Sequence, residues 1–224
     1  MRTRLFALVL FLAIFVPWVG LAGYGKSAQP PAPSTPAIAQ PVPLEHQVAS
    51  ASEHEFRLTS TTFENDQLIP SSMIFNGQLG SVCTGSNESP ELSWTPALHG
   101  TRSYAVVLFD VTANFTHWGV FNIPPSITEL SAGAGAAGSG PGQQILNDAF
   151  NFGYSGPCPP PGLVPGGIHR YVFTVYALDK ELDLPPSVDF PPTGAALYRA
   201  MIGHVIDRAS IAGHFRCTDA TSCS

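Results

Sequence analysis

Three long runs of β-branched and aromatic residues restrict this chain to a mainly β fold. They are SYAVVLFD at 103–110, HWGVFNI at 117–123 and HRYVFTVYAL at 169–178. Residues of these types favour strands, and turn-forming residues separate the runs. Shorter runs at 56–59 (FRLT), 91–94 (ELSW) and 210–216 (SIAGHFR) predict further strands. We therefore expect one β-rich domain without internal repeats.

One segment has the periodicity of a helix. In GAALYRAMIGHVIDR, Leu197, Met201 and Val205 recur at a spacing of four residues, which predicts a helix over 194–208. The segment 154–168, YSGPCPPPGLVPGGI, holds too many prolines and glycines for regular structure. We predict that it forms a shaped loop.

The N-terminal segment, residues 1–28, has the layout of an export signal. Arg2 and Arg4 precede an apolar run, from Leu5 to about Ala22, that contains no acidic residue. The run also approaches the roughly 20 residues that a membrane-spanning helix needs. A cleaved signal peptide and an uncleaved N-terminal anchor both remain open. Either one exports the rest of the chain, which we expect in the periplasm or cell envelope, or secreted.

The remainder divides into a linker and a domain. Residues 29–55 are rich in Pro, Ala, Ser and Gln and lack apolar periodicity, which predicts a disordered linker. Residues 56–224 are long enough to bury a core and form the predicted domain. The formal net charge is −6, and no Lys/Arg cluster follows the first four residues. This charge pattern argues against a nucleic-acid partner.

Four cysteines lie in the exported part: Cys83, Cys158, Cys217 and Cys223. In an oxidising compartment they allow two disulfides in three pairings. We favour a short tail loop closed by Cys217–Cys223, with Cys83–Cys158 joining two loops; buried free thiols are the alternative. The sequence holds no CxxC motif, which argues against redox catalysis and a thiolate metal site.

Two of the long runs end in polar residues on their apolar face. Because side chains alternate along a strand, Asp110 shares a face with the apolar residues of 103–110. His169 and Tyr171 likewise share a face with Phe173 and the apolar residues that follow it. Arg170 points to the opposite face, where it is solvated or paired with a carboxylate.

The third run begins with His117, which alternation places on the face of Gly119, Phe121 and Ile123. Asp110 and His117 flank the segment VTANFT, so pairing as a hairpin would bring them together at its mouth. A carboxylate, two imidazoles and a phenol beside a glycine-rich loop suit an anion such as a phosphate group. Each side chain alone has another explanation: a solvated strand end, an Asx turn or a core phenol.

At this point five segments resemble a known family. NESPELSW, THWGVFNIP, YSGPCPPPG, GIHRYVFTVYALD and AMIGHVIDRASIAG are similar to the phosphatidylethanolamine-binding protein family, in its bacterial branch related to Raf kinase inhibitor-like proteins. The matches run in order from about residue 56 to 216. The resemblance implies a large antiparallel sheet packed against a smaller one, with a C-terminal helix.

The resemblance also implies a small pocket that accepts phosphate-type anions. Its residues here would be Asp110, His117, His169 and Tyr171, with Gly156 and Pro157 as the wall. One motif departs from the family pattern: the usual DPDAP is DVTAN at 110–114, which keeps the first aspartate and loses both prolines. Because proline fixes φ, the pocket wall and the ligand can differ from those of the family.

We expect an exported, regulatory or storage protein that binds a small anionic or phosphorylated ligand, such as a phospholipid headgroup. We expect no catalytic residue, no cofactor and no bound metal. Two alternatives stay open: an inhibitor of an extracytoplasmic protease or other protein partner, and a hydrolase that uses the Asp/His cluster. The absence of GxSxG and HExxH motifs argues against the hydrolase. Membrane association, through the N-terminal segment or through lipid headgroups, and a homodimer are also left open.

Overall fold

The computed structural model describes residues 55–77, 83–160, 167–184, 192–219 and 222–223, with side chains described as far as residue 216. All of them belong to one compact unit that spans residues 49–224. The predicted export segment 1–28 lies outside the described residues, and so does the predicted linker 29–55 apart from its last residue.

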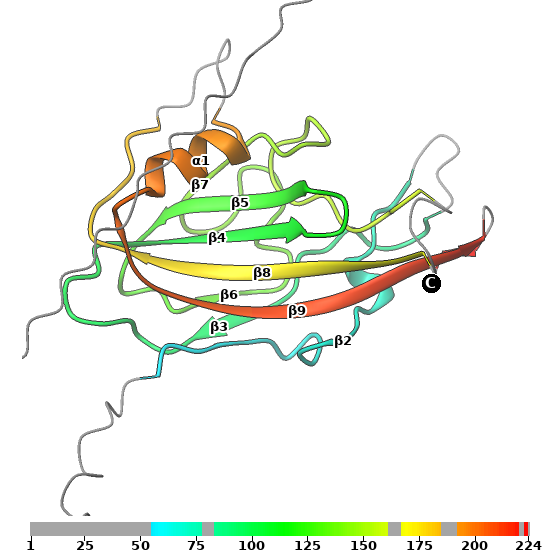
Figure 1. The fold of residues 1–224 in the computed structure, drawn as a ribbon, viewed down its shortest axis with the longest axis horizontal. Coiled ribbons are helices and arrows are strands. Elements are labelled where there is room, and N and C mark those ends of the chain that lie inside the picture. Colours follow the sequence, from blue (N-terminus) through cyan, green and yellow to red (C-terminus); the bar gives the residue numbers. More distant parts are fainter. Residues whose placement is uncertain (1–54, 78–82, 161–166, 185–191, 220–221, 224) are drawn as a thin grey trace, which may run out of the picture. The chain divides into compact units, whose positions relative to one another are not determined.

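Two β-sheets form the body of this unit (Figure 1). The large sheet has the strand order β10 (Ser222–Cys223), β9 (Val205–Asp219), β8 (Ile168–Leu178), β4 (Ser103–Asp110), β5 (Phe115–Ile123) and β7 (Gln143–Gln144). These strands pair antiparallel, and the short strand β2 (Gln67–Leu68) adds a parallel pairing to β9. The small antiparallel sheet has the order β1 (Leu58–Thr59), β3 (Leu92–Trp94) and β6 (Glu129–Leu130).

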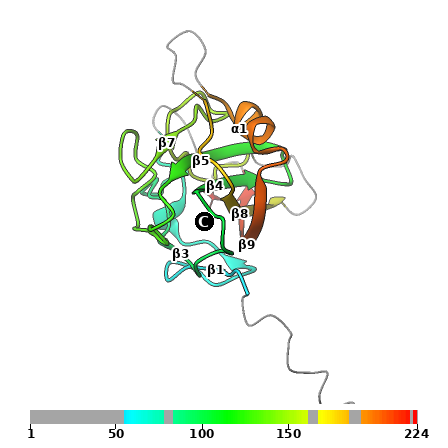
Figure 2. The same cartoon turned by 90° about the vertical axis from the view of Figure 1, so that its left-hand side faces the viewer.

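The large sheet buries both of its faces. One face packs against the small sheet in a core that includes Trp94, Leu108, Trp118 and Phe173. The other face packs against helix α1 (Gly194–Met201), which contributes Leu197 and Met201. Figure 2 shows α1 and the small sheet on opposite sides of the large sheet. The expected mainly β fold, with two sheets and a helix near the C-terminal end, is confirmed.

The predicted helix 194–208 is wrong in its second half. Helix α1 begins after Thr193, whose side chain accepts a hydrogen bond from the backbone N–H of Ala196, and it ends at Met201. Gly203 then adopts a φ of 78°, a left-handed conformation that stops a helix. Val205 starts β9 and pairs with Leu178, so the helical spacing that included it was fortuitous.

The strand predictions are accurate in the centre of the large sheet. The run 103–110 coincides with β4, and β8 starts one residue before the predicted 169. Strand β5 begins two residues before the predicted 117, and the predicted 210–216 is the middle of the longer strand β9. A short 3-10 helix, Ser71–Met73, follows β2.

A disulfide joins Cys83 to Cys158, with a Cα–Cα distance of 5.9 Å. This pairing was one of the two expected. Strand β10 places Cys223 opposite Cys217 on β9, but their side chains lie outside the described set. The tail disulfide therefore stays a prediction.

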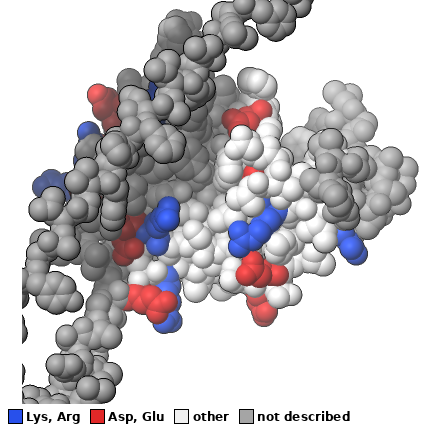
Figure 3. All heavy atoms as spheres, in the orientation of Figure 1, with Lys and Arg blue, Asp and Glu red and all other residues white. Residues whose placement is uncertain are grey.

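Charged side chains are sparse and mixed in sign. On the described part of the face in Figure 3, basic side chains lie beside acidic ones. Arg170 has the expected carboxylate partner, because its Nη2 lies 3.3 Å from Asp66 Oδ1. Within the described ranges, no helix has the length and apolar character to cross a membrane.

Candidate functional site

Asp110 and His169 form a buried pair at one end of the large sheet. Strands β4 and β8 are neighbours, and their register places Asp110 opposite Tyr171. The Nδ1 atom of His169 lies 2.6 Å from Asp110 Oδ2. Asp110 Oδ1 accepts hydrogen bonds from the backbone N–H groups of Thr112 (2.8 Å) and Ala113 (3.1 Å). The aspartate thus closes an Asx turn and orients the imidazole at the same time.

His117 reaches the same site because of a β-bulge. Leu108 pairs with Trp118 and Phe109 pairs with Thr116, so His117 stands opposite no residue of β4. A bulge of this kind lets two successive side chains point to one face. The expected common face of His117 and Phe121 is therefore wrong: Phe121 packs on the α1 side, whereas His117 lies beside Tyr171, with 5.3 Å between ring centroids.

The second irregularity in β5 reverses the phase again. Tyr104 pairs with Ile123 and Val106 pairs with Val120, and between them Asn122 has a φ of 56°. Ile123 consequently packs in the core beneath the small sheet and not beside Phe121. A strict two-residue period could not predict either change of face.

The surroundings of His117 fix its tautomer. Its Nδ1 donates to the backbone carbonyl oxygen of Ser155 at 2.7 Å, because a carbonyl can only accept. Burial lowers the pKa of His117, and this effect outweighs the opposing carbonyl bond and the charges of Asp110 and Asp148. The ring is therefore neutral near pH 7, and its Nε2 carries a lone pair.

Two buried polar atoms at this site lack partners. His169 Nε2 and Tyr171 Oη make no hydrogen bond with any described residue. Burial raises the pKa of the Tyr171 phenol, and the nearby Asp110 carboxylate raises it further, so the hydroxyl keeps its proton. Since buried polar groups are nearly always paired, two such atoms on neighbouring rings call for an explanation. Trp94 Nε1, on the small sheet, is the other such atom in the described part.

A cavity of about 120 Å³ contains these groups. It is lined by Asp110, Ala113, Phe115, His117, Cys158, Pro159, Pro160, His169 and Tyr171. A neighbouring cavity of about 220 Å³ shares Phe115, His117 and Cys158 with it. Its other lining residues are Phe75, Ala149, Ser155 and Gly156. His117 thus stands at the boundary of two adjoining spaces.

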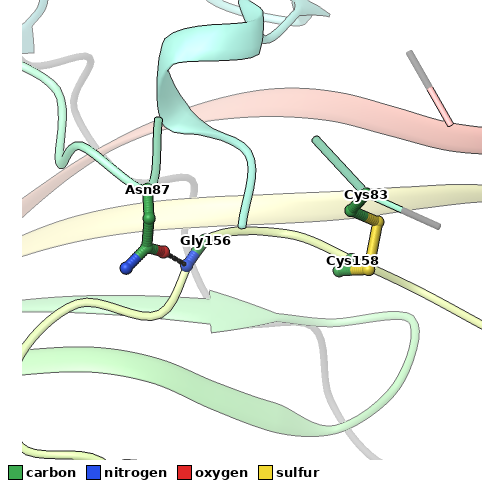
Figure 4. Close-up of a disulfide and its surroundings, with 4 residues drawn as sticks. All are labelled: Cys83, Asn87, Gly156 and Cys158. Carbon is green, nitrogen blue, oxygen red and sulfur yellow. Dashed lines mark hydrogen bonds between the residues drawn. A yellow bond between two sulfur atoms is a disulfide. The ribbon is translucent and has the colours of Figure 1, made fainter. Parts of the chain in front are cut away.

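The wall of both cavities is the segment 154–160, which we call the rim segment. The backbone N–H of Gly156 donates to Asn87 Oδ1 at 2.7 Å, as Figure 4 shows. A Cβ on Gly156 would lie 2.2 Å from Met73 O, so this close approach requires glycine. The carbonyl oxygen of Pro157 accepts a hydrogen bond from the backbone N–H of Phe75. Pro157 is buried and is the predicted wall residue that lines neither cavity.

Asn147 is a positioning residue that sequence reasoning missed. Its buried Nδ2 donates to the carbonyl oxygens of His117 (3.2 Å) and Gly153 (2.9 Å) and to Ser155 Oγ (2.9 Å). Its Oδ1 accepts from the backbone N–H groups of Ala149 and Asn151. One side chain therefore ties strand β5 to the rim segment. A lone asparagine in a polar loop gives no pattern from which such a role could be read.

The chain matches a known protein family over most of the described domain. The family model described as phosphatidylethanolamine-binding protein matches residues 59–216, which include most of both sheets and every residue of the site. The chain belongs to the phosphatidylethanolamine-binding protein (PEBP) family.

Individual relatives extend this result. The chain is 40% identical over 140 residues to a UPF0098 protein of Methanothermobacter thermautotrophicus, which covers 60% of this chain and 87% of that protein. It is 35% identical over 137 residues to "Putative lipoprotein LppC" of Mycobacterium tuberculosis, and the match covers 59% of this chain and 62% of that protein. The crystal structure of Escherichia coli YbcL, titled a new member of the mammalian PEBP family, superposes with a TM-score of 0.62 at 31% identity, covering 72% of this chain and 98% of YbcL.

The departure from the PEBP motif DPDAP has a structural counterpart. Thr112 stands where the family has its second aspartate, and its Oγ1 accepts a hydrogen bond from the backbone N–H of Arg170 at 2.9 Å. The backbone N–H of Val111 donates to the carbonyl oxygen of Arg170. The DVTAN loop is thereby attached to β8 without either proline, and it contributes one carboxylate to the cavity.

The geometry gives little support to the hydrolase alternative. The His117 ring contacts the carbonyl oxygen of Ser155, and the Ser155 hydroxyl accepts from Asn147; among the described residues, no imidazole is hydrogen-bonded to this hydroxyl. Among the described residues, no group of three His, Cys, Asp or Glu side chains is arranged to hold a metal ion. The Asp110 carboxylate is directed at His169 and two backbone amides.

Proposed function

We propose that this PEBP-family domain binds a small phosphate-type group in the cavity between His117, His169 and Tyr171. The main support is a pair of buried atoms without hydrogen-bond partners among the described residues, His169 Nε2 and Tyr171 Oη, whose side chains line one cavity. Leaving a buried polar atom unpaired costs about 1–3 kcal/mol, and a ligand oxygen would recover that cost. The N-terminal segment and the lipoprotein-named relative both suggest export. Together with the proposed binding, they favour a ligand-binding protein of the cell envelope or the extracellular space.

Calorimetric titration of the purified chain with inorganic phosphate tests the proposal. His169→Ala removes Nε2 and should weaken phosphate binding at least tenfold, roughly the 1.4 kcal/mol of one hydrogen bond to a charged group. His204→Ala is the matched control, because His204 pairs with Asp179 at the opposite end of β8 and is partly exposed. Equal phosphate binding by the His169 variant and the wild-type chain would reject the site.

A further inference from the structure

The hydrogen-bonding capacity of the cavity can be worked out atom by atom, and this inference rests on the proposed function. His117 and His169 both use Nδ1, toward the Ser155 carbonyl oxygen and the Asp110 carboxylate respectively. Because both of these oxygens accept, both Nδ1 atoms donate. Each ring therefore has Nε2 as its remaining nitrogen.

The two Nε2 atoms differ in what they can offer. His169 faces a carboxylate, so a second proton on this ring would be balanced at 2.6 Å, and Nε2 would then donate to an anion beside the Tyr171 hydroxyl. His117 faces a neutral carbonyl and is almost completely buried. In its neutral ring, Nε2 carries a lone pair and is a hydrogen-bond acceptor. This lone pair attracts an O–H group of a ligand and repels an ionised oxygen.

The charges around His117 reinforce this assignment. Asp110 reaches it from β4, Asp148 from the loop after β7, and His169 from β8. Tyr171 and Tyr154 are phenols whose pKa values burial raises, so they are uncharged. Neither cavity has Lys or Arg among its described lining residues, and the side chain of Arg170 pairs with Asp66 instead. A fully ionised group would meet little positive charge here.

We propose that the pocket selects an oxyanion that still carries a proton, as inorganic phosphate does, over one that does not. In this arrangement Tyr171 Oη and His169 Nε2 donate to ionised oxygens, while the ligand O–H donates to His117 Nε2. An oxyanion without a proton, such as sulfate or a phosphodiester headgroup, binds only when His117 takes up a proton itself.

Sulfate and inorganic phosphate test this directly, because at about pH 8 both are doubly charged and similar in size, and phosphate alone keeps an O–H. We expect sulfate to bind the wild-type chain at least tenfold more weakly. Titrations in two buffers of different ionisation enthalpy should show uptake of about one proton more with sulfate than with phosphate, because His169 is in the same form in both complexes. Equal affinities with equal proton uptake would overturn this inference and leave the proposed function intact, whereas the absence of phosphate binding would overturn both.

Two organic probes distinguish a lipid headgroup from a free phosphate. Glycerol phosphate loses its last proton near pH 6, so its affinity should fall between about pH 6 and 8 more steeply than that of inorganic phosphate. Dimethyl phosphate, which resembles a headgroup diester, should behave like sulfate. Binding of dimethyl phosphate as tight as that of inorganic phosphate would contradict the selection.

His117→Gln is the diagnostic variant, because an amide both donates and accepts. The ratio of phosphate to sulfate affinity should fall toward one, while thermal unfolding reports whether the chain is folded. If this variant does not fold, the difference in proton uptake between sulfate and phosphate, measured on the wild-type chain, tests the role of His117. An unchanged ratio of phosphate to sulfate affinity in a folded variant would show that His117 does not distinguish a protonated oxyanion from an unprotonated one.

Discussion

The side chain of Asn87 holds the backbone of Gly156, 69 residues further along the chain, through a 2.7 Å hydrogen bond from the Gly156 N–H to Asn87 Oδ1. Asn87 has a φ of 53°, a left-handed conformation that asparagine tolerates better than most residues. The same residue therefore accommodates a left-handed backbone and fixes the wall of the cavities.

Replacing Asn87 separates these two contributions. Asn87→Gly keeps the left-handed backbone and loses the hydrogen bond, which should lower the free energy of unfolding by about 1–2 kcal/mol. Asn87→Ala loses the hydrogen bond and also strains the left-handed backbone, so the free energy of unfolding should fall by about 1 kcal/mol more. Urea unfolding of the two variants measures the difference. Wild-type midpoints in both would mean that this contact contributes nothing to stability.

Tyr171→Phe should uncouple stability from binding. The phenylalanine ring keeps the packing against His117 and removes a buried hydroxyl that has no partner among the described residues. The free energy of unfolding of the unliganded chain should stay the same or rise by about 1 kcal/mol. Phosphate affinity should fall about tenfold, measured by the same titration. A variant that is less stable and binds normally would assign the hydroxyl a purely structural role.

Removing the disulfide should weaken both the fold and the pocket. The double variant Cys83→Ser, Cys158→Ser opens a link across 75 residues and should lower the free energy of unfolding by about 2–4 kcal/mol. Because Cys158 lines both cavities, phosphate affinity should fall as well. Cys217→Ser, Cys223→Ser is the control, with a smaller effect expected from its short loop. Mass spectrometry of unreduced peptides shows whether the tail pair is joined.

His117 should make the domain less stable in mild acid. Its pKa in the folded chain lies below the ordinary value of 6.5, so the unfolded chain takes up a proton first as the pH falls. The stability contributed by the neutral ring is complete above about pH 6.5 and is lost as the pH falls through the folded pKa. In His117→Gln the unfolding free energy should decline less between about pH 7 and 5, with His204→Gln as the control. Parallel curves for wild type and His117→Gln would contradict this account.

Alternation along the strands was sufficient for β4 and β8. Asp110, His169 and Tyr171 all lie on the face that the two-residue period predicts, because these two strands pair without interruption from Ser103 to Asp110. Their meeting point follows from the register, in which Asp110 is opposite Tyr171. Where the backbone pairing is regular, the local pattern of residues is enough to predict the face on which each side chain lies.

The remaining features depend on contacts that are distant in sequence. The face of His117 is set by a bulge against β4, and the end of helix α1 is set by Gly203 and by the pairing of Val205 with Leu178. Asn147 acts on backbone carbonyls that the chain brings to it only when folded. Of these features only the helix end has a local signal, Gly203, because glycine commonly ends a helix; the bulge and the contacts of Asn147 have none.

The bulge at His117 makes the spacing within β5 as important as its residues. A chain with the same residue types and one residue fewer between Thr116 and Trp118 would resume regular pairing with β4. Its imidazole would then be lost or would turn beneath α1, away from Tyr171. In comparing relatives, a single gap at this point would therefore say more about ligand recognition than many substitutions elsewhere in the sheet.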